Sequence, residues 1–538
     1  MSTTATPPRP TGERSGSVLP RALAALLGVV SVGAALGAGH LVAALLSPAS
    51  SPFLAVGDTV IRFSPQWLTE FAKTTFGTAD KPILLGGMLV VILGVAAAGG
   101  LLSRRGPAAG TAVVLLMGLV GLAVVVLAPG FAAADLAAPL VATAAGLLAF
   151  RLLHRRASAA GSGSEDGGED GDEDGDGGGT GRPVSRRSVL VGTSAVGVGA
   201  LAAAGGGQLL GADVGGSRAA VTAQLARVRL VETAPAIPAS AAFPESIPFV
   251  TSNAGFYRVD TALQIPAQSA ADWTCRVHGL VDREITLTFD DLLARPLVER
   301  TITMTCVSNE VGGPYISTAD FIGVELRDIL LEAGVRPGAD QVLSTSLDSW
   351  TAGTPTDVVL EPGRGALLAV GMNGEALPPE HGFPVRMLVP GLYGFLSATK
   401  WLADIELTTF AAAQGYWLQR GWGQFAPIRT QSRIDSPRGF QQVAAGAVTV
   451  SGIAWSQPRG ISRVEVRADD GPWQDAELAT EVNTRTWRMW RASLDLGPGT
   501  HRVQSRATDA EGATQPEERR APIPDGATGW PVVVFTVT

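Results

Sequence analysis

The sequence predicts a multi-domain protein with three differently folded parts: an N-terminal α-helical transmembrane bundle, an α+β domain and a C-terminal all-β, immunoglobulin-like sandwich. Composition is the first indication, because 46% of the 538 residues are hydrophobic and only 17% are charged, which is too apolar for one soluble enzyme. Long apolar runs are confined to the first part of the chain, whereas short alternating strands begin near residue 245. Strands at regular short spacing with turn signals then begin near residue 433.

The N-terminal part contains four apolar stretches that are each long enough to cross the hydrocarbon core of a membrane. They follow a Pro- and Ser-rich tail at 1–18, which is expected to be disordered, and lie at 21–46, 83–102, 110–128 and 133–153 within a transmembrane region at 19–156. Arginines precede the first stretch, separate the second from the third and close the fourth. If every stretch crosses, these clusters share one side, which the positive-inside rule places in the cytoplasm, with the loop 47–82 outside. We therefore expect a multi-pass protein of the plasma membrane.

An acidic flexible linker is expected at 157–184. Residues 165–176 carry eight carboxylates and no base, and so account for the whole net charge of −8. The rest of the chain is close to neutral and has no basic footprint for nucleic acid.

A further apolar run at 185–212 begins with Arg186 and Arg187. It resembles an internal twin-arginine export signal, and an ordinary fifth transmembrane helix is the alternative. Either interpretation places the chain after about residue 213 outside the cytoplasm.

The α+β domain is expected at 230–432 and the sandwich at 433–538. In the first, alternation predicts strands at 273–277 and 285–289, and a helix is predicted at 320–333. In the second, strands are predicted at 447–453, 462–468, 485–493, 499–507 and 531–537.

Two cysteines in a chain of this length exclude a disulfide scaffold or a multi-thiolate zinc site. Cys275 shares a strand face with Trp273 and Val277, which favours a packing role; a disulfide with Cys306 is the alternative. Cys306 lies where a predicted strand runs out into Gly312 and Gly313. A thiol at such a strand end can reach a ligand, although packing is the commoner role of a cysteine.

Three blocks of sequence resemble the sulfite oxidase family of molybdenum enzymes. They are Cys306-Val-Ser-Asn309 followed by Gly313-Pro-Tyr-Ile-Ser-Thr-Ala-Asp-Phe-Ile-Gly-Val-Glu-Leu326; His381-Gly-Phe-Pro-Val-Arg386 running through Pro390-Gly-Leu-Tyr-Gly394 to Lys400-Trp401; and Asn253-Ala-Gly-Phe256-Tyr257-Arg258. The resemblance extends from about 245 to 538 and includes the family's sandwich-type dimerisation domain.

The resemblance implies a molybdenum–molybdopterin cofactor whose metal is bound by the thiolate of Cys306. The pterin phosphate needs cations and hydrogen-bond donors, which are expected from His381, Arg386 and Lys400, with Ser397 and Thr399 beside them. Further cofactor contacts are expected from Asn253, Phe256, Tyr257, Arg258 and Asp348. The catalytic set is expected to be Cys306, Arg258 and Tyr416, and packing at the rim is an equal alternative for Tyr416. Arg386 lies in the strand-like run 385–389, where an arginine without an anionic partner would be costly.

Two departures from the family pattern concern the substrate pocket. Sulfite oxidases carry arginines just after the Cys-x-x-Asn, and Glu310 and Val311 stand there in this chain. A carboxylate beside the metal would repel sulfite, so sulfite is not expected as the substrate. The family tryptophan of the same block is Phe321.

The resemblance implies a two-electron oxygen-atom transfer on a small substrate, coupled to one-electron exchange with a partner. His40 and His154 are predicted at opposite ends of the helical region and cannot face one iron. We therefore expect no haem in this chain and a separate electron-transfer protein or quinol-linked membrane partner, and a homodimer through the sandwich. The alternative function is a cofactor-free, membrane-anchored binding or assembly protein derived from this fold. Joint retention of Cys306, His381, Arg386 and Lys400 argues against it.

Overall fold

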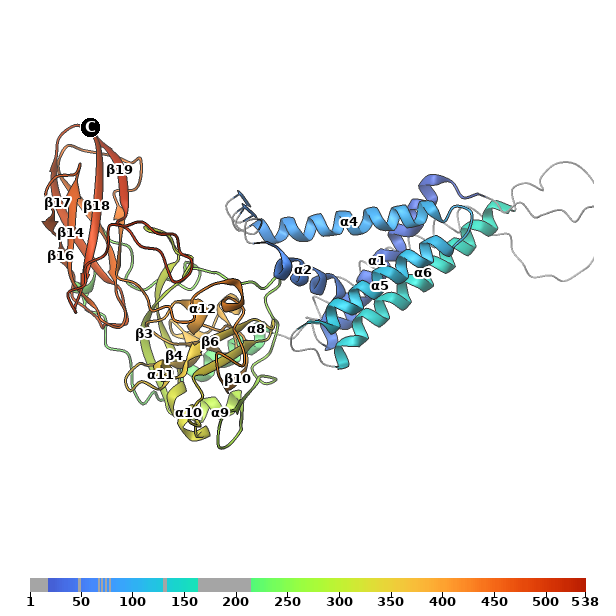
Figure 1. Ribbon diagram of the computed structural model, residues 1–538, viewed down its shortest axis with the longest axis horizontal. Coiled ribbons are helices and arrows are strands. Elements are labelled where there is room, and N and C mark those ends of the chain that lie inside the picture. Colours follow the sequence, from blue (N-terminus) through green and yellow to red (C-terminus); the bar gives the residue numbers. More distant parts are fainter. Residues whose placement is uncertain are drawn as a thin grey trace, which may run out of the picture. The chain divides into compact units, whose positions relative to one another are not determined.

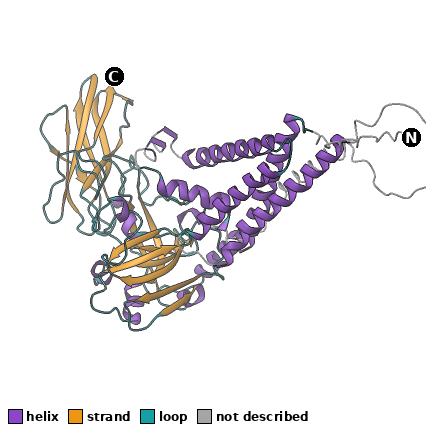
Figure 2. Cartoon of the chain, turned by 45° about the vertical axis from the view of Figure 1, so that its right-hand side comes forward, coloured by secondary structure: helices purple, strands orange, loops and turns teal. Residues whose placement is uncertain are grey.

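The computed structural model describes residues 18–46, 50–128 apart from scattered positions between 66 and 78, 133–162, and 214–538. The chain divides into two compact units, Met1–Gly211 and Ala212–Thr538 (Figure 1). The long helices belong to the first unit and all of the described strands to the second (Figure 2). Residues 1–17 of the expected tail at 1–18, most of the acidic linker and the whole twin-arginine segment at 185–212 lie outside the described residues.

Four helices of the first unit are long and apolar enough to cross a membrane, judged by length and composition. They are α1 (Arg21–Leu46), α4 (Asp80–Leu102), α5 (Ala108–Val126) and α6 (Ala137–Ser162), and two shorter elements, α2 (Pro52–Phe63) and η3 (Ala133–Leu136), lie between them. The four correspond to the predicted apolar stretches. However, α6 continues past residue 157, where the linker was expected to begin, because Ala157 packs in a cluster with Leu19, Ala24 and Leu153.

Small residues allow α1 and α4 to approach closely. A methyl group at Gly28 would collide with the carbonyl oxygen of Ala96, and one at Gly100 would collide with that of Ala24. This reciprocal contact explains why two helices of almost uniform hydrophobicity have a defined register.

The arginine clusters of the first unit gather at one end, as the sequence predicted. The backbone N–H of Leu19, before α1, donates to the carbonyl of Arg104 in the α4–α5 turn at 3.0 Å. His154, near the end of α6, lies 2.8 Å from the carbonyl oxygen of Ser103 in the same turn. Gly39, next to His40, instead packs against Ala142 in the first half of α6, so the two histidines lie toward opposite ends of the unit.

The second unit begins with α8 (Val214–Leu225), earlier than the expected start at 230, because Val221 and Leu225 are buried in its core. Two sheets follow, with the orders β2-β1-β10-β5-β6 and β3-β4-β7-β8, and β9 pairs with β7. The strands are β1 (Thr274–Gly279), β2 (Ile285–Thr288), β3 (Leu297–Thr305), β4 (Ile316–Glu325), β5 (Gln341–Ser346), β6 (Thr351–Pro355), β7 (Leu367–Met372), β8 (Glu375–Ala376), β9 (Arg386–Leu388) and β10 (Leu402–Thr408). Short helices connect them: α9 (Phe289–Leu293), α10 (Leu326–Ala333), α11 (Thr356–Leu360) and α12 (Gly394–Ser397).

The predicted helix at 320–333 is wrong over its first six residues. These residues belong to β4, which pairs with β3 on one side and β7 on the other, so that a paired, buried strand replaces the expected helix. A methyl group at Gly323 would collide with the carbonyl of Leu368, which shows how closely β4 and β7 approach. Only α10 is helical, and it ends at Gly334, whose φ of +72° suits a glycine after a helix.

The C-terminal domain consists of two sheets, β11-β13-β17-β16 and β12-β19-β18-β14-β15. The strands are β11 (Gln431–Ser436), β12 (Gln442–Val443), β13 (Gly446–Trp455), β14 (Ile461–Ala468), β15 (Gln474–Asp475), β16 (Glu477–Leu478), β17 (Arg488–Leu496), β18 (Gly499–Asp509) and β19 (Val532–Val537). Residues such as Val450 and Trp490 from the first sheet and Val464, Val503 and Phe535 from the second share one core. All five predicted strands are present, although β11 starts two residues before the expected boundary at 433.

The two domains of the second unit are joined at β3 and at the loop that follows it. The backbone N–H of Trp487 donates to Thr303 Oγ1 at 2.8 Å, and the Gln457 side chain donates to the Thr303 carbonyl at 3.2 Å. Arg433 donates to the carbonyl of Gly313 at 3.2 Å. The C-terminal domain therefore supports the segment that carries Cys306.

Candidate functional site

Cys306 stands directly after the last residue of β3. Its backbone N–H donates to the carbonyl of Tyr315 at 3.0 Å, and its Sγ lies 2.9 Å from Ser308 Oγ. The thiol is partly exposed and forms no disulfide bond. Cys275 is fully buried in β1 and the two cysteines form no disulfide, so the predicted packing role of Cys275 is confirmed.

The loop after Cys306 is held in shape by Asn309. The Asn309 N–H donates to the Cys306 carbonyl at 3.1 Å, and Asn309 Oδ1 accepts from the Tyr315 N–H at 2.8 Å. A Cβ at Gly313 would lie 2.5 Å from that same Oδ1, and Gly312 has a φ of +78°. The glycines are therefore needed for the loop to close around Asn309.

An aromatic pair from the segment 253–258 lies beside Cys306 and Arg386. Phe256 and Tyr257 stack at 5.4 Å between ring centroids, and the N–H of Tyr257 donates to Ser317 Oγ at 3.1 Å. Burial raises the pKa of Tyr257 well above its usual range, the nearby Cys306 side chain raises it further, and the Arg386 guanidinium opposes both. Tyr257 is therefore within electrostatic reach of both the thiol and the cation.

Arg386, the first residue of β9, is a buried cation. Only 4% of it is exposed, and one of its terminal nitrogens donates to the carbonyl of His381 at 3.1 Å. Among the described residues no carboxylate forms an ion pair with it, and its Nε has no acceptor. Burial lowers the pKa of Arg386 to about 10. A guanidinium in this setting is costly unless an anion approaches it.

His381 is buried next to Arg386 and stays neutral at physiological pH. Its Nε2 lies 3.0 Å from the carbonyl oxygen of Asn253, which can only accept, so Nε2 carries the proton and Nδ1 is left as an acceptor. Burial, and then the neighbouring Arg386, lower the pKa of His381 to about 4.

Lys400, which was expected as a cation for the pterin phosphate, is already paired with a carboxylate. Its Nζ donates to Asp260 Oδ2 at 2.7 Å, and the same oxygen accepts from Arg258 Nε at 2.8 Å. Burial nevertheless lowers the pKa of Lys400 to about 8. Asp348 accepts from the hydroxyl of Ser346, and burial, the largest influence on it, raises its pKa, with Asp260 and Lys400 close enough to contribute. Arg258, Asp348 and Lys400 thus lie in one charged network around Asp260.

Other predicted site residues have structural contacts. The Ser397 hydroxyl donates to the carbonyls of Leu392 and Tyr393, and Thr399 Oγ1 lies 2.6 Å from Ser344 Oγ. The Asn253 side chain bonds with Glu375 and Asn373 in and beside the β7–β8 turn.

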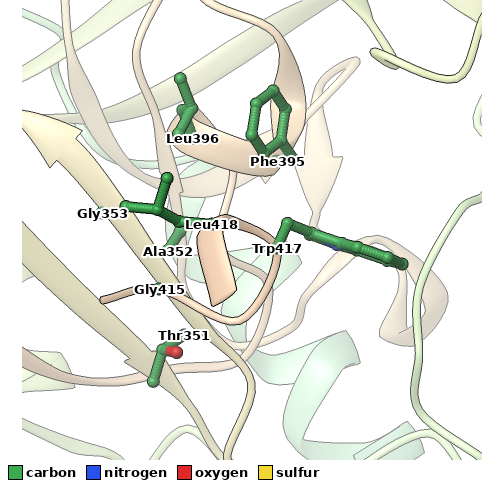
Figure 3. Close-up of a pocket in the computed structure, with 8 residues that line it drawn as sticks. All are labelled: Thr351, Ala352, Gly353, Phe395, Leu396, Gly415, Trp417 and Leu418. Carbon is green, nitrogen blue, oxygen red and sulfur yellow. The ribbon is translucent and has the colours of Figure 1, made fainter. Parts of the chain in front are cut away.

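Tyr416 lies under the guanidinium of Arg420, 3.6 Å from its ring centroid. Next to it is a small hollow of about 10 Å³, lined by Trp417 and by residues of β6 and α12 (Figure 3). Such a volume has room for about one water molecule and none for a pterin. The contacts of Tyr416 therefore favour the packing alternative.

The structure adds residues that sequence reasoning missed. Tyr315 is 40% exposed and pairs with Cys306 through the backbone, and Ser308 lies against the thiol. Burial raises the pKa of Tyr393 to about 12, with Cys306 among the smaller contributors. Tyr315, Ser308 and Tyr393 all lie within the motif blocks, but the blocks do not reveal how the loop turns. Asp260 follows Arg258 by two residues, a weak signal for a shared ion pair.

The donors at this site fit a metal that is bound by the Cys306 thiolate and held by an organic group with a negatively charged phosphate. The described residues contain no group of three or more His, Cys, Asp or Glu that could hold a metal ion on their own. They do present one accessible soft sulfur, the unpaired Nε of Arg386 and, beside Cys306, a buried Asn309 Nδ2 without an acceptor. A metal that brings its own sulfur ligands and a phosphate matches this set.

Two family models match parts of the second unit. A model of the oxidoreductase molybdopterin binding domain matches residues 262–417, and one of the Mo-co oxidoreductase dimerisation domain matches 425–523. The chain is 31% identical to the sulfite oxidase of Gallus gallus over 317 residues, which cover 50% of this chain and 68% of that protein. It is 32% identical to the mitochondrial sulfite oxidase of Mus musculus over 296 residues, covering 46% of this chain and 53% of that protein. The alignment thus spans little more than half of the mouse protein.

Similarity also extends to an NADH nitrate reductase of Hordeum vulgare, with 27% identity over 47% of this chain and 35% of that protein. The solved structure of the sulfane dehydrogenase SoxCD from Paracoccus pantotrophus is 23% identical and covers 55% of this chain and 85% of that chain, with a TM-score of 0.48.

Proposed function

The chain belongs to the sulfite oxidase-like family of molybdopterin-dependent oxidoreductases, and we propose that it catalyses a two-electron oxygen-atom transfer on a small substrate. When bound, the molybdenum–molybdopterin group supplies the oxygen-atom exchange and the storage of electrons. The observation that most supports this proposal is Arg386, a buried guanidinium without an anionic partner among the described residues, in the same site as the partly exposed thiol of Cys306.

The chain's own residues hold and orient the group. Cys306 provides the protein's thiolate for the metal, and the Asn309 contacts set its position at the end of β3. Arg386 offers unpaired N–H donors for phosphate oxygens, and neutral His381 offers Nδ1 as an acceptor for an N–H or O–H of the ligand. Lys400 adds positive charge, which Asp260 partly neutralises.

We also propose that the substrate is not a small dianion. Glu310 is exposed four residues after Cys306, at a position where the sulfite oxidases of the family carry arginine. A negative charge at the mouth of the site lowers the local concentration of anions and leaves neutral compounds unaffected.

Membrane insertion and orientation are part of the same proposal. The four apolar helices would cross the plasma membrane with their arginine-rich end in the cytoplasm, and the second unit would work outside. Electrons would pass to a separate redox protein or a quinol-linked membrane partner.

We propose that the C-terminal domain forms a homodimer and has an immunoglobulin-like topology. Its first sheet, β11-β13-β17-β16, corresponds to strands A, B, E and D of an immunoglobulin domain, and β19-β18-β14 of the second sheet correspond to G, F and C. The match of this region to a dimerisation domain supports the homodimer.

Metal analysis of the purified full chain tests the proposal. Protein from molybdate-supplied cells should contain about one molybdenum per chain, and Cys306→Ala should remove it. Cys275→Ala is the matched control, because it deletes a buried thiol away from the site and should keep the metal. Wild-type protein without molybdenum or pterin would favour the cofactor-free binding protein instead.

A further inference from the structure

An open groove of about 690 Å³ lies at the arginine-rich end of the first unit. It follows the turn between α4 and α5 and reaches α6. Its walls are apolar and include Leu102, Pro107, Ala112 and Leu115, and the one charged side chain that lines it is Arg151 of α6. The groove thus combines a hydrocarbon-like surface with a single cation.

The positive charge at this groove is not compensated within the described part of the unit. Arg151 is exposed and forms no hydrogen bond or ion pair with a described residue. Arg155 follows it by one turn on the same helix face. The sequence has no Asp or Glu at 81–134 or at 136–164. Asp80 and Asp135 are at the beginnings of α4 and α6, away from the ends that meet here.

Two backbone donors add to this charge. Ala108 and Ala109, in the first turn of α5, line the groove, and no described side chain accepts from their N–H groups, whereas Ser103 Oγ accepts from that of Gly110. First-turn N–H groups have no acceptor within their own helix and favour a nearby anion. A negative group held by Arg151 at this end would also meet these donors.

We propose that the groove binds an anionic glycerophospholipid of the cytoplasmic leaflet, with the phosphodiester beside Arg151 and an acyl chain along Pro107, Ala112 and Leu115. An amphiphile matches both features, because a free phosphate would leave the apolar walls in contact with water and a neutral lipid would leave the arginine unpaired. The inference rests on the proposed membrane insertion of α1, α4, α5 and α6.

Native mass spectrometry of the full chain, released from nanodiscs of mixed dioleoylphosphatidylglycerol and dioleoylphosphatidylcholine, tests the site. Wild type should retain phosphatidylglycerol selectively, and excess inorganic phosphate should not displace it. Arg151→Gln should lower retention about fivefold, the effect expected for one arginine at a membrane surface. Ala112→Phe should lower it without any change of charge, because the ring fills the groove.

Arg156→Gln is the matched control. It removes the same charge from the same helix, but it lies about 140° around the helix from Arg151 and should change retention less than about twofold. Equal losses in both arginine variants, or equal retention of the two lipids by wild type, would overturn the site. Displacement by phosphate would identify a free-anion site instead.

The acidic residues 165–176 are the other possible occupant. If replacing their carboxylates with amides abolished the difference between wild type and Arg151→Gln, the linker would be the occupant and the lipid proposal would be wrong. Alkaline carbonate washing of membranes tests membrane insertion separately from lipid binding. Release of the chain would contradict membrane insertion itself. A chain that stays in the membrane but shows no lipid selectivity would contradict only lipid binding in the groove.

Discussion

Replacing Arg386 with methionine should stabilise the cofactor-free protein and weaken cofactor retention, two effects of opposite sign. The side chain is buried, donates one hydrogen bond to the His381 carbonyl and has an Nε without an acceptor. Burial lowers its pKa from 12.5 to about 10, which corresponds to a cost of about 3 kcal/mol for the charged form in the folded state. Below pH 10 the folded and unfolded chains both carry the charge, so the whole cost applies at neutral pH.

Methionine removes this cost but also the charged hydrogen bond to His381, which contributes about 1.5–3 kcal/mol. The net gain for the cofactor-free protein is then about 1 kcal/mol, or a rise in Tm of about 2 °C for a unit of this size. With a phosphate in place, the guanidinium has its anion. The same substitution should then cost about 2 kcal/mol or more of binding, at least about thirtyfold in affinity.

The assay compares thermal unfolding and molybdenum content of the full chain from cells with and without pterin synthesis. Arg459→Met is the matched control, because Arg459 Nε donates to the buried Asp509 at 2.8 Å. Its loss leaves an uncompensated carboxylate and should cost about 3 kcal/mol in both preparations. If Arg386→Met lowers the Tm of the cofactor-free protein as Arg459→Met does, or leaves the molybdenum content unchanged, the guanidinium is a structural element and our reasoning is wrong.

Three further predictions concern the same site. The folded pKa of His381 is about 4 against 6.5 in the unfolded chain, so the unfolded state takes up the proton first and the cofactor-free protein should lose up to about 3 kcal/mol as pH falls from 6.5 to 4. In His381→Gln the denaturant midpoint should fall less steeply between pH 6.5 and pH 4 than in wild type. An unchanged pH dependence would contradict the conclusion that His381 is buried in its neutral form. Gly313→Ala should destabilise the protein by about 1–2 kcal/mol and reduce bound molybdenum, because its Cβ would lie 2.5 Å from Asn309 Oδ1. A full molybdenum content in this variant would show that the loop can shift to accommodate the methyl group without losing the metal. Glu310→Gln should raise kcat/KM for an anionic oxygen donor by about threefold at low salt with no change for a neutral one, and equal effects on both would exclude an electrostatic cause.

Local patterns predicted most of the strands and helices well. The strands β1, β2, β13, β14 and β18 begin within one residue of their predicted starts, because side-chain alternation is a property of neighbouring residues. The apolar stretches behave in the same way. The failure at 320–325 has a different origin: this segment became a strand because β3 and β7 pair with it on both sides, and those partners lie elsewhere in the chain.

The charges of the site were predicted less completely than its motifs. Arg386 and His381 were expected near an anion and are buried together, as the apolar run around Arg386 indicated. Lys400 was expected to contribute its charge to a phosphate, and the structure pairs it with Asp260, 140 residues away. No pattern within one segment reports such a pair, because the energy of an ion pair depends on distance in space.

By itself the sequence determined the order of the three parts, the apolar faces and the residues with the right chemistry, since these depend on composition and short-range periodicity. Only the tertiary structure decided which of those residues lack a partner. Burial of Arg386 without a carboxylate results from how β9 packs against β7 and the 253–258 segment, and desolvation is a property of all surrounding atoms together.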